Sequence, residues 1–137
     1  MFSMLVKLAT MLVMAVEIST STSPQVDLIP VEKAIVDGTN AQRARYGLPP
    51  LTLDPALERT ARTHAAWMTN SHSLQHSSIG VAENIAWGQR TADQAMADWM
   101  NSSGHRANIL NPSYRRIGVA AYTASDGSCY WCQQFLQ

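Results

Sequence analysis

The chain has 137 residues, of which 46% are apolar and 15% are charged, and this length and composition suit one compact domain. Ten Lys and Arg residues balance ten Asp and Glu residues, so the formal net charge is zero. A balanced chain does not provide the broad positive field that attracts nucleic acids or anionic membrane surfaces. We therefore expect no nucleic-acid partner.

The N-terminal residues have the pattern of a secretory signal. Lys7 precedes a largely apolar run from Leu8 to Val16, and a Ser/Thr-rich stretch and Pro24 follow. The run is shorter than the roughly 20 apolar residues that span a bilayer. The alternative is an amphipathic or buried N-terminal helix. We predict a signal peptide over residues 1–23, a single extracellular domain over residues 24–137, and no transmembrane segment in the mature protein.

Two helices are predicted in the first half of the domain. The first runs from Pro30, a favourable first-turn residue, to Tyr46, because Gly47 supplies a common helix stop. Asp54 is a good N-cap for the second helix, which continues to about Asn70. Apolar residues recur along the second helix at spacings of three and four, so one of its faces is expected to turn inward.

The middle of the chain predicts a loop, a short segment and a third helix. Residues 71–79 are polar and rich in histidine, which is typical of a loop. Residues 82–87 fit either a short strand or an irregular segment. The third helix begins near Thr91, keeps an apolar face, and is expected to end at Gly104.

Two strands are predicted at the end of the chain. They cover residues 117–123 and 129–136, and the Ser-Asp-Gly-Ser sequence between them is typical of a tight turn. Helices come first and strands mostly last. This order predicts an α+β fold with helices packed on a small antiparallel sheet.

The chain has two cysteines, Cys129 and Cys132, both within the last predicted strand. In a strand, residues three apart have Cα atoms roughly 10 Å apart, at about 3.3 Å per residue, whereas a disulfide needs them within about 7 Å. The pair can bridge only across a bulge or turn. Redox catalysis needs such a pair at a helix N-terminus, and zinc binding needs two more ligands, so neither is favoured.

Two of the four histidines are expected to have structural or solvated side chains. His64 lies on the apolar face of the second helix, which favours a hydrogen-bonded core histidine. His72 lies in the polar loop and is most simply a solvated side chain. We therefore look for chemistry at the other two histidines.

His76 and His105 are the candidate site histidines. Glu83 follows His76 by seven residues, and His105 comes directly after Gly104, where the third helix is expected to end. A residue beside a helix end can be rigid and still face a cleft. Two imidazoles and one carboxylate fit an open zinc site completed by water, and equally a hydrogen-bonded polar cluster without a metal.

Common catalytic motifs are absent from the sequence, among them HExxH, GxSxG, the P-loop and GxGxxG. Ser77, Ser102 and Ser103 lie close to the candidate histidines in sequence, but serine is common in loops, and a structural role is favoured. The sequence favours a protein that is not an enzyme and leaves the question open.

The ordered set of motifs over residues 31–136 resembles the CAP superfamily, which includes the sperm-coating and plant pathogenesis-related class 1 proteins. The WMNSSGHRANIL segment at 99–110 matches the form found in its bacterial-like and fungal-like branch. No single motif is decisive, but their order is specific. The other matching segments are NAQR (40–43), GLPPL (47–51), DPAL (54–57), ARTHAAWM (61–68), QHS (75–77), AENIA (82–86), IGVA (117–120) and YWCQQF (130–135).

The resemblance implies secretion and an α-β-α sandwich with a small antiparallel sheet between helical layers. Family members with the full pattern carry two histidines and two glutamates in a central cleft, and in several the histidines hold a divalent metal. By resemblance the cleft residues are His76, Glu83, Asn84, Ser102 and His105, with His76 and His105 as the zinc ligands. Ser102 stands where the second glutamate is expected, which removes a negative charge and is expected to weaken cation binding.

The cysteine framework of the animal and plant members is also missing, so stability is expected to come from packing. Trp67, Trp87, Trp99 and Trp131 are expected to be the largest apolar contributors to the core.

Three functions are weighed for such a domain. The first is a secreted binding module for a small apolar ligand such as a sterol or a fatty acid, because family members bind lipids. The second is a secreted effector, defence or toxin-like protein that acts through protein contacts. The third is a metal-dependent hydrolase with Glu83 as general base. We expect the binding module in preference to the other two.

Overall fold

A computed structural model describes residues 25–137, and the signal peptide expected over residues 1–23 lies outside this range. No helix among the described residues has the length and apolar character that crossing a bilayer requires. The helices and strands, in chain order, are α1 (Pro30–Arg45), β1 (Thr52–Leu53), α2 (Pro55–Ser71), β2 (Ala82–Trp87), α3 (Ala92–Met100), α4 (Ser103–Ile109), β3 (Arg116–Thr123) and β4 (Cys129–Leu136).

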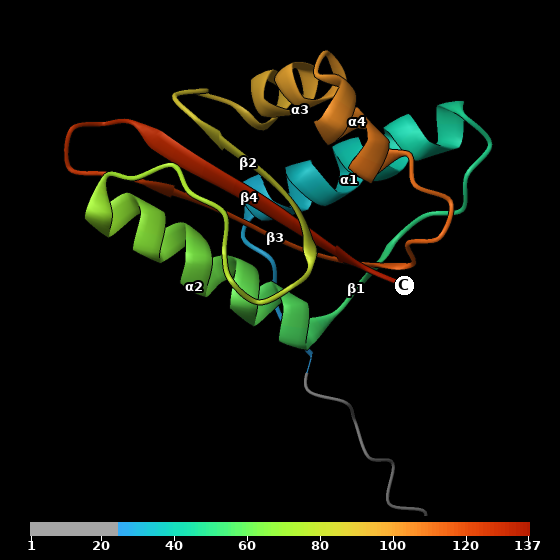
Figure 1. Ribbon diagram of the computed structural model, residues 1–137, viewed down its shortest axis with the longest axis horizontal. Helices are drawn as coiled ribbons and strands as arrows, with labels where there is room; N and C mark the ends of the chain where they lie inside the picture. The colour runs from blue at the N-terminus through green and yellow to red at the C-terminus, as the bar shows by residue number, and fades with distance from the viewer. Residues whose placement is uncertain (1–24) are drawn as a thin grey trace, which may run out of the picture.

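A four-stranded sheet lies between two helical layers, with α2 on one face and α1, α3 and α4 on the other (Figure 1). The strand order is β1-β3-β4-β2. This architecture confirms the predicted α+β sandwich. The expectation of a wholly antiparallel sheet is wrong at one edge, because β1 runs parallel to β3 while the other two pairings are antiparallel. The short β1 carries the chain from α1 to α2 along the outside of β3, and this path sets its direction.

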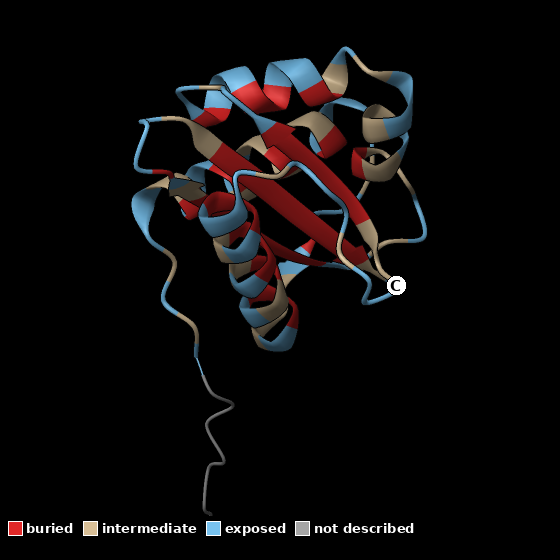
Figure 2. Cartoon of the chain, turned by 60° about the vertical axis from the view of Figure 1, so that its left-hand side comes forward, coloured by how far each residue is buried: buried red, intermediate tan, exposed pale blue. Residues whose placement is uncertain are grey.

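The side chains of the two central strands alternate between the helical layers. Ile117, Val119 and Trp131 pack against α1, α3 and α4, whereas Ala120 and Cys132 pack beneath α2. This period of two is the normal geometry of a strand with both faces covered. The strands are accordingly buried along most of their length (Figure 2).

The backbone of α2 approaches β3 closely at Gly118. A Cβ placed on this glycine would lie 2.4 Å from the carbonyl carbon and oxygen of Leu57. The neighbouring Glu58 side chain reaches over the strand, and its Oε2 accepts a hydrogen bond from the Val119 amide at 2.7 Å. Only glycine therefore allows the helix and the sheet to meet at this point.

The third predicted helix is two helices in the structure. It begins as expected with Thr91 as N-cap, but α3 ends at Met100, and Ser102 adopts an extended conformation as the N-cap of α4. Gly104 therefore lies inside the first turn of α4 and is not a helix stop. The predicted end at Gly104 is wrong because the break falls at Ser102, whose φ of −117° and ψ of 119° interrupt the helix.

The four tryptophans do not all belong to the core. Trp99 and Trp131 are each only 1% exposed, as expected for major core residues. Trp67 and Trp87 are 46% and 54% exposed, so the expectation that they pack in the core is wrong. Trp67 lies on the outer side of α2, and Trp87 is the last residue of the edge strand β2.

Arg43 anchors the chain around α4 to the end of α1. Its guanidinium is fully buried and donates hydrogen bonds to the carbonyl oxygens of Pro49, Ile109 and Asn111 at 2.9 Å and of Tyr114 at 3.3 Å. One of these oxygens belongs to the last residue of α4. The arginine thereby fixes the short helix that carries His105.

The open edge of β2 is covered by side chains from α3 and α4. Trp99 Nε1 donates to the carbonyl oxygen of Ile85 at 3.1 Å, and Asn108 Nδ2 lies 3.4 Å from the carbonyl oxygen of Glu83. These contacts occupy backbone acceptors that an edge strand would otherwise expose. They also hold α4 beside the strand that carries Glu83.

Candidate functional site

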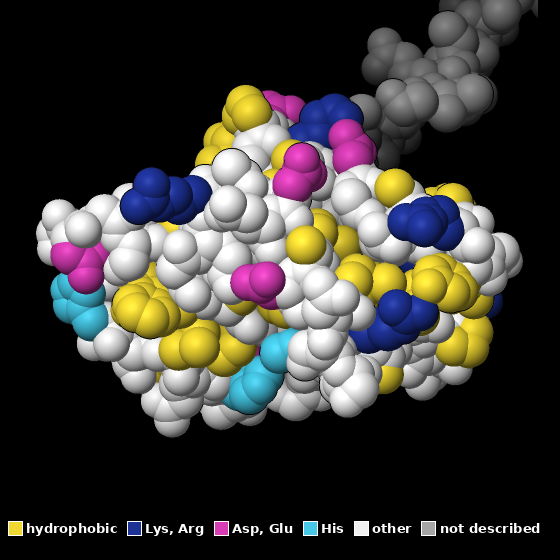
Figure 3. Space-filling view, turned by 90° about the horizontal axis from the view of Figure 1, so that it is seen from above, with side chains coloured by type: hydrophobic (Ala, Val, Ile, Leu, Met, Phe, Trp, Pro, Cys, Tyr) yellow, Lys and Arg dark blue, Asp and Glu magenta, His cyan; other side chains and the backbone are white. Residues whose placement is uncertain are grey.

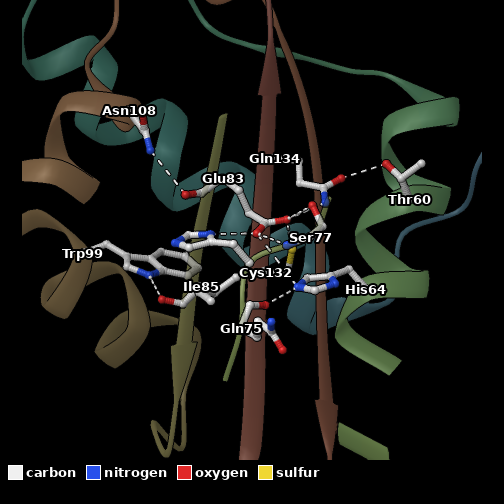
Figure 4. A network of polar contacts seen from close by, with 11 residues as sticks. Thr60, His64, Gln75, Ser77, Glu83, Ile85, Trp99, Asn108, Cys132 and Gln134 are labelled. Atoms are coloured by element: carbon white, nitrogen blue, oxygen red, sulfur yellow. Dashed lines mark hydrogen bonds and ion pairs between the residues drawn. The ribbon is translucent and has the colours of Figure 1, made fainter. Parts of the chain in front are cut away.

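Glu83 lies at the centre of a buried polar network beneath α2 (Figure 4). Its side chain is 3% exposed, yet both oxygens have donors. Oε1 is 2.9 Å from His76 Nδ1 and 3.0 Å from the Ser77 amide, while Oε2 is 2.8 Å from both Ser77 Oγ and Gln134 Nε2. The carboxylate is thus held by hydrogen-bond donors from the loop over residues 72–81 and from β4.

The protonation of this carboxylate follows from its surroundings. Burial raises the pKa of Glu83, but the hydrogen bonds from Gln134, Ser77 and His76 outweigh it and leave the pKa below its usual value. The carboxylate is therefore charged at neutral pH. Cys132 lies below it with its Sγ 3.8 Å from Oε2, and burial followed by this negative charge raises the pKa of the thiol well above its usual value. Both cysteines are free, and Cys132 remains an unreactive core thiol.

His76 is oriented by Glu83. Because Nδ1 faces the charged carboxylate, Nδ1 carries the proton and Nε2 is left with a free lone pair. The His76 side chain is 62% exposed, so this second nitrogen is accessible from solvent. The imidazole is thereby prepared as an acceptor or a metal ligand.

The Nδ1 of His105 also has a side-chain partner, which is a hydroxyl and not a carboxylate. Its Nδ1 is 2.9 Å from Ser102 Oγ, the side chain at the position where the resemblance expects the second glutamate. Burial, and then electrostatic repulsion from His76 when that ring is protonated, lower the pKa of His105. His76 thus comes from the loop over residues 72–81 and His105 from α4, and each ring has a hydrogen-bond partner at its Nδ1.

Asn84 does not line the cleft but supports it from below. It is fully buried, and its Nδ2 donates to the carbonyl oxygen of His105 at 3.0 Å and to Gln133 Oε1 at 2.9 Å. Asn108 donates to its Oδ1 at 2.9 Å. The expectation of Asn84 as a cleft residue is corrected accordingly, because its side chain points to the α4 face of the sheet while that of Glu83 points to α2.

Two glutamines of β4 are part of the site and were not singled out by sequence reasoning. In the register of β2 and β4, Gln134 lies opposite Glu83 and Gln133 lies opposite Asn84. Gln134 Oε1 also accepts from Thr60 at 2.7 Å, which ties the network to α2. Each of these strands has two consecutive polar residues, Glu83-Asn84 in β2 and Gln133-Gln134 in β4. Neighbouring residues of a strand point to opposite faces, so these pairs could have indicated one polar contact on each face of the sheet.

His64 is buried and hydrogen-bonded, as its position on the apolar face of α2 predicted. Its Nε2 lies 2.5 Å from the carbonyl oxygen of Gln75, so it fixes the loop that carries His76. Its ring also stacks on Trp67 with 5.8 Å between centroids. His72 is exposed at the C-terminal end of α2 and contributes nothing to the cleft.

A groove of about 670 Å³ runs between α2 and the loop over residues 72–81, and we refer to it as the α2 groove. One wall is the outer stripe of α2, and the other wall is the loop from Gln75 to Ile79. His64 and His76 both line it, so the groove borders the polar network around Glu83. Its lining residues are Ala56, Arg59, Thr60, Thr63, His64, Trp67, Gln75, His76, Ser77, Ser78 and Ile79.

His76 and His105 are the residues that the resemblance names as metal ligands. Among residues 25–137 no group of three or more His, Cys, Asp or Glu side chains is arranged to hold a metal. Glu83 is close to His76, but hydrogen-bond donors already occupy both of its oxygens. The two imidazoles expected as ligands each have their Nδ1 beside a hydrogen-bond partner, so Nε2 is the nitrogen of each ring that has none among the described residues.

The sandwich, the contact between His76 and Glu83 and the sequence all point to one family. The chain belongs to the CAP family, described as the cysteine-rich secretory protein family, which it matches over residues 36–135. This match covers most of the described domain and confirms the resemblance seen in the sequence.

Related proteins occur in bacteria and in animals. The chain is 38% identical to the uncharacterized protein YkwD of Bacillus subtilis, over 86% of this chain and 51% of YkwD. It is 28% identical to the human Golgi-associated plant pathogenesis-related protein 1, over 70% of this chain and 75% of that protein. An extracellular protein containing a SCP domain from Bacillus anthracis shares the fold with a TM-score of 0.70 and 26% identity, over 82% of this chain and 45% of that one. The chain thus spans about half the length of YkwD.

Proposed function

We propose that this CAP domain is secreted and acts as a binding module for a small apolar ligand of the sterol or fatty-acid class. The observation that carries the proposal is the α2 groove, whose walls include two large apolar side chains left open to solvent. Trp67 is 46% exposed and Ile79 is 48% exposed. Concave sites with apolar walls and a few fixed polar groups are typical of small-molecule binding.

The groove is attached to rigid elements, which favours ligand binding without a large rearrangement. His64 bonds the loop wall to α2, and Gln134 connects Thr60 of α2 to Glu83. A preformed groove reduces the ordering cost that a ligand must offset on binding. In the space-filling view, Lys, Arg, Asp and Glu side chains are interspersed and hydrophobic side chains are visible between them (Figure 3). This view shows the side of α3 and α4 and not the α2 groove, and on that side the mixed charges do not favour a highly charged macromolecular partner.

The hydrolase alternative is weaker because of the state of Glu83. A general base must accept a proton in the reaction, whereas this carboxylate is saturated with hydrogen bonds that lower its pKa. It is also 3% exposed. Glu83 is better suited to orienting His76 than to taking a proton from water.

We further propose that His76 and His105 bind a divalent cation such as zinc through their Nε2 atoms. When bound, such an ion would supply Lewis acidity and an additional positive charge beside His76. Glu83 and Ser102 orient the two rings by holding Nδ1. With two protein ligands the affinity is expected to be lower than that of sites with three or four.

Lipid extraction from the purified secreted protein, followed by mass spectrometry, tests the binding function. We expect a sterol or fatty acid to co-purify, or to be taken up when either is added to delipidated protein. Protein that carries no lipid and takes up neither class would contradict the proposal. The secretion is tested separately by N-terminal sequencing of protein from the culture medium, where a mature chain starting after about residue 23 is expected.

A further inference from the structure

A second hollow, of about 540 Å³, lies between the end of β2 and α3, and it shares no lining residue with the α2 groove. We refer to it as the Trp87 hollow. It contains one large aromatic side chain, two amides and one carboxylate, and no Lys or Arg is part of its lining. The lining residues are Trp87, Gly88, Gln89, Gln94, Ala97 and Asp98.

The backbone on the β2 side of the Trp87 hollow is fixed to the sheet. Gly88 turns the chain out of β2 with a φ of 98°, a conformation that favours glycine, and its amide donates to the carbonyl oxygen of Cys129 at 2.9 Å. The next carbonyl oxygen, that of Gln89, accepts a hydrogen bond from Trp131 Nε1 at 3.1 Å. The hollow is therefore preformed, which reduces the ordering cost of binding a ligand.

The polar side chains on the α3 side are also held in place. Gln94 and Asp98 are four residues apart on α3, so they share one face of the helix. Gln94 Oε1 accepts from the Arg90 amide at 2.8 Å, and Asp98 Oδ2 accepts from Gln89 Nε2 at 2.8 Å. Gln94 Nε2 and Asp98 Oδ1 have no partner in the part of the chain that the structure describes. The hollow thus has an oriented donor and an oriented acceptor available to a ligand.

Trp87 adds an exposed aromatic surface to this polar wall. It is 54% exposed, and its ring is tilted by 47° against Tyr130 with 6.5 Å between the centroids. The indole N–H groups of Trp99 and Trp131 donate to carbonyl oxygens, whereas that of Trp87 has no partner within residues 25–137. An exposed indole beside fixed polar groups suits a ligand with one apolar face and a polar edge.

A pyranose ring has this combination of surfaces. When its hydroxyls are equatorial, as in glucose, C–H groups form its flat faces and can pack on an indole. Its neighbouring hydroxyls both donate and accept, so they complement the Gln94 amide and the Asp98 carboxylate. An alkyl chain would leave these polar groups unpaired, and an organic cation would find a single aromatic ring in place of a cage.

We propose that the Trp87 hollow binds a neutral pyranose with equatorial hydroxyls, as a unit of a β-1,4-linked saccharide. The sugar ring packs on Trp87, and its hydroxyls bond to Gln94 and Asp98. This site is separate from the α2 groove, so its test does not depend on the proposed binding of an apolar ligand.

NMR titration of the purified protein tests the ligand class. The probes are cellotetraose, chitotetraose, sorbitol and choline, and the readouts are the backbone amide of Gly88 and the side-chain amide of Gln94. We expect saturable shifts with the two saccharides at about millimolar Kd, and none with sorbitol, an open-chain polyol, or with choline. Shifts with neither saccharide, equal shifts with sorbitol, or shifts with choline alone would overturn the inference.

A first pair of variants tests the aromatic surface. Trp87→Ala is expected to lower the affinity for the tighter-binding saccharide about tenfold, and Trp87→Phe, which keeps a smaller ring, to lower it less. Trp67→Ala is the matched control, because Trp67 is 46% exposed and lies in the α2 groove. It is expected to leave saccharide affinity unchanged.

A second pair tests the polar wall. Asp98→Ala is expected to lower saccharide affinity about three- to fivefold, because it removes a charged acceptor. Asp93→Ala changes an exposed acid of the same helix that is not part of the lining, and no effect is expected. Equal saccharide affinity in the wild type, Trp87→Ala and Asp98→Ala would place the saccharide elsewhere and show that the inference is wrong.

Discussion

His76 Nδ1 lies 2.9 Å from Oε1 of Glu83, and this contact determines which nitrogen of the imidazole faces solvent. The carboxylate is almost fully buried and charged, so it selects the tautomer with a proton on Nδ1. Nε2 is then free to bind a cation. Ser102 Oγ orients the His105 ring in the same way, but a hydroxyl can donate or accept and therefore does not select a tautomer.

The first prediction concerns the two cleft histidines. His76→Ala and His105→Ala are each expected to abolish measurable zinc binding, because either change leaves a single protein ligand. Competition with a chromophoric chelator measures the affinity. His72→Ala is the matched control, since His72 is exposed and lies outside the cleft. Unchanged zinc affinity in both cleft variants would show that any bound metal lies at another place.

The second prediction concerns Ser102. Ser102→Glu introduces a carboxylate next to Nδ1 of His105, in the manner of Glu83 and His76. We expect zinc affinity to rise about tenfold, since outer partners of metal-binding histidines typically change affinity by 10–100-fold. The same chelator competition gives the value. Ser103→Glu adds the same charge one residue away and controls for a general electrostatic effect; an equal rise in both variants would contradict the specific role of position 102.

The third prediction is a pH dependence of stability from Glu58. Burial, and then the negative charge of Glu32, raise the pKa of Glu58 to about 7, despite a hydrogen bond from the Val119 amide. Its Oε1 accepts no hydrogen bond within the described part of the chain, although Arg62 Nε is 3.2 Å away. The folded state therefore binds a proton more tightly than the unfolded state. This contribution is fully present below the ordinary pKa of 4.5 and is lost as the pH rises through about 7.

Glu58→Gln tests this assignment. Glutamine keeps an oxygen for the Val119 amide and carries no charge. The free energy of unfolding of the wild type is expected to fall by about 1–3 kcal/mol between roughly pH 5 and pH 8, and that of the variant to fall much less. Urea denaturation over this pH range measures both. Parallel pH profiles for the two proteins would show that Glu58 titrates normally.

The fourth prediction concerns the contact between α2 and β3. Gly118→Ala places a methyl group 2.4 Å from the Leu57 backbone, and neither backbone can move independently of its element. We expect a loss of about 3 kcal/mol or more, or failure to fold. Gly104→Ala is the control, because nothing lies within 4 Å of a Cβ at that helical position. It is expected to raise stability by about 0.5–1 kcal/mol. Similar thermal denaturation curves for wild type and Gly118→Ala would contradict the close approach.

The order of the main elements was predictable from local sequence signals. The cap at Asp54, the apolar stripe of α2 and the tight turn before β4 are each encoded within a few residues. The break between α3 and α4 was not predictable in this way. Gly104 is a common helix stop, but here the neighbouring Ser102 takes the extended conformation and begins a new helix.

The sequence indicated which residue types form the site, but it indicated only part of how their side chains contact one another. The spacing of His76 and Glu83 fits a direct contact, and the structure contains one. The roles of Gln133 and Gln134 depend on the register of β4 against β2, which no short sequence pattern specifies. The burial of Asn84 and the exposure of Trp67 follow from which face of an element meets the core, and this is decided by tertiary packing.

Amide chemical-shift mapping by NMR, with decanoate or cholesterol added to the delipidated protein, tests the binding function most directly. We expect saturable shifts concentrated on the outer face of α2 and on residues 75–79, with few shifts around α1 and α3. Saturable shifts confined to the α1 and α3 side of the sandwich, or no shifts with either ligand, would contradict it.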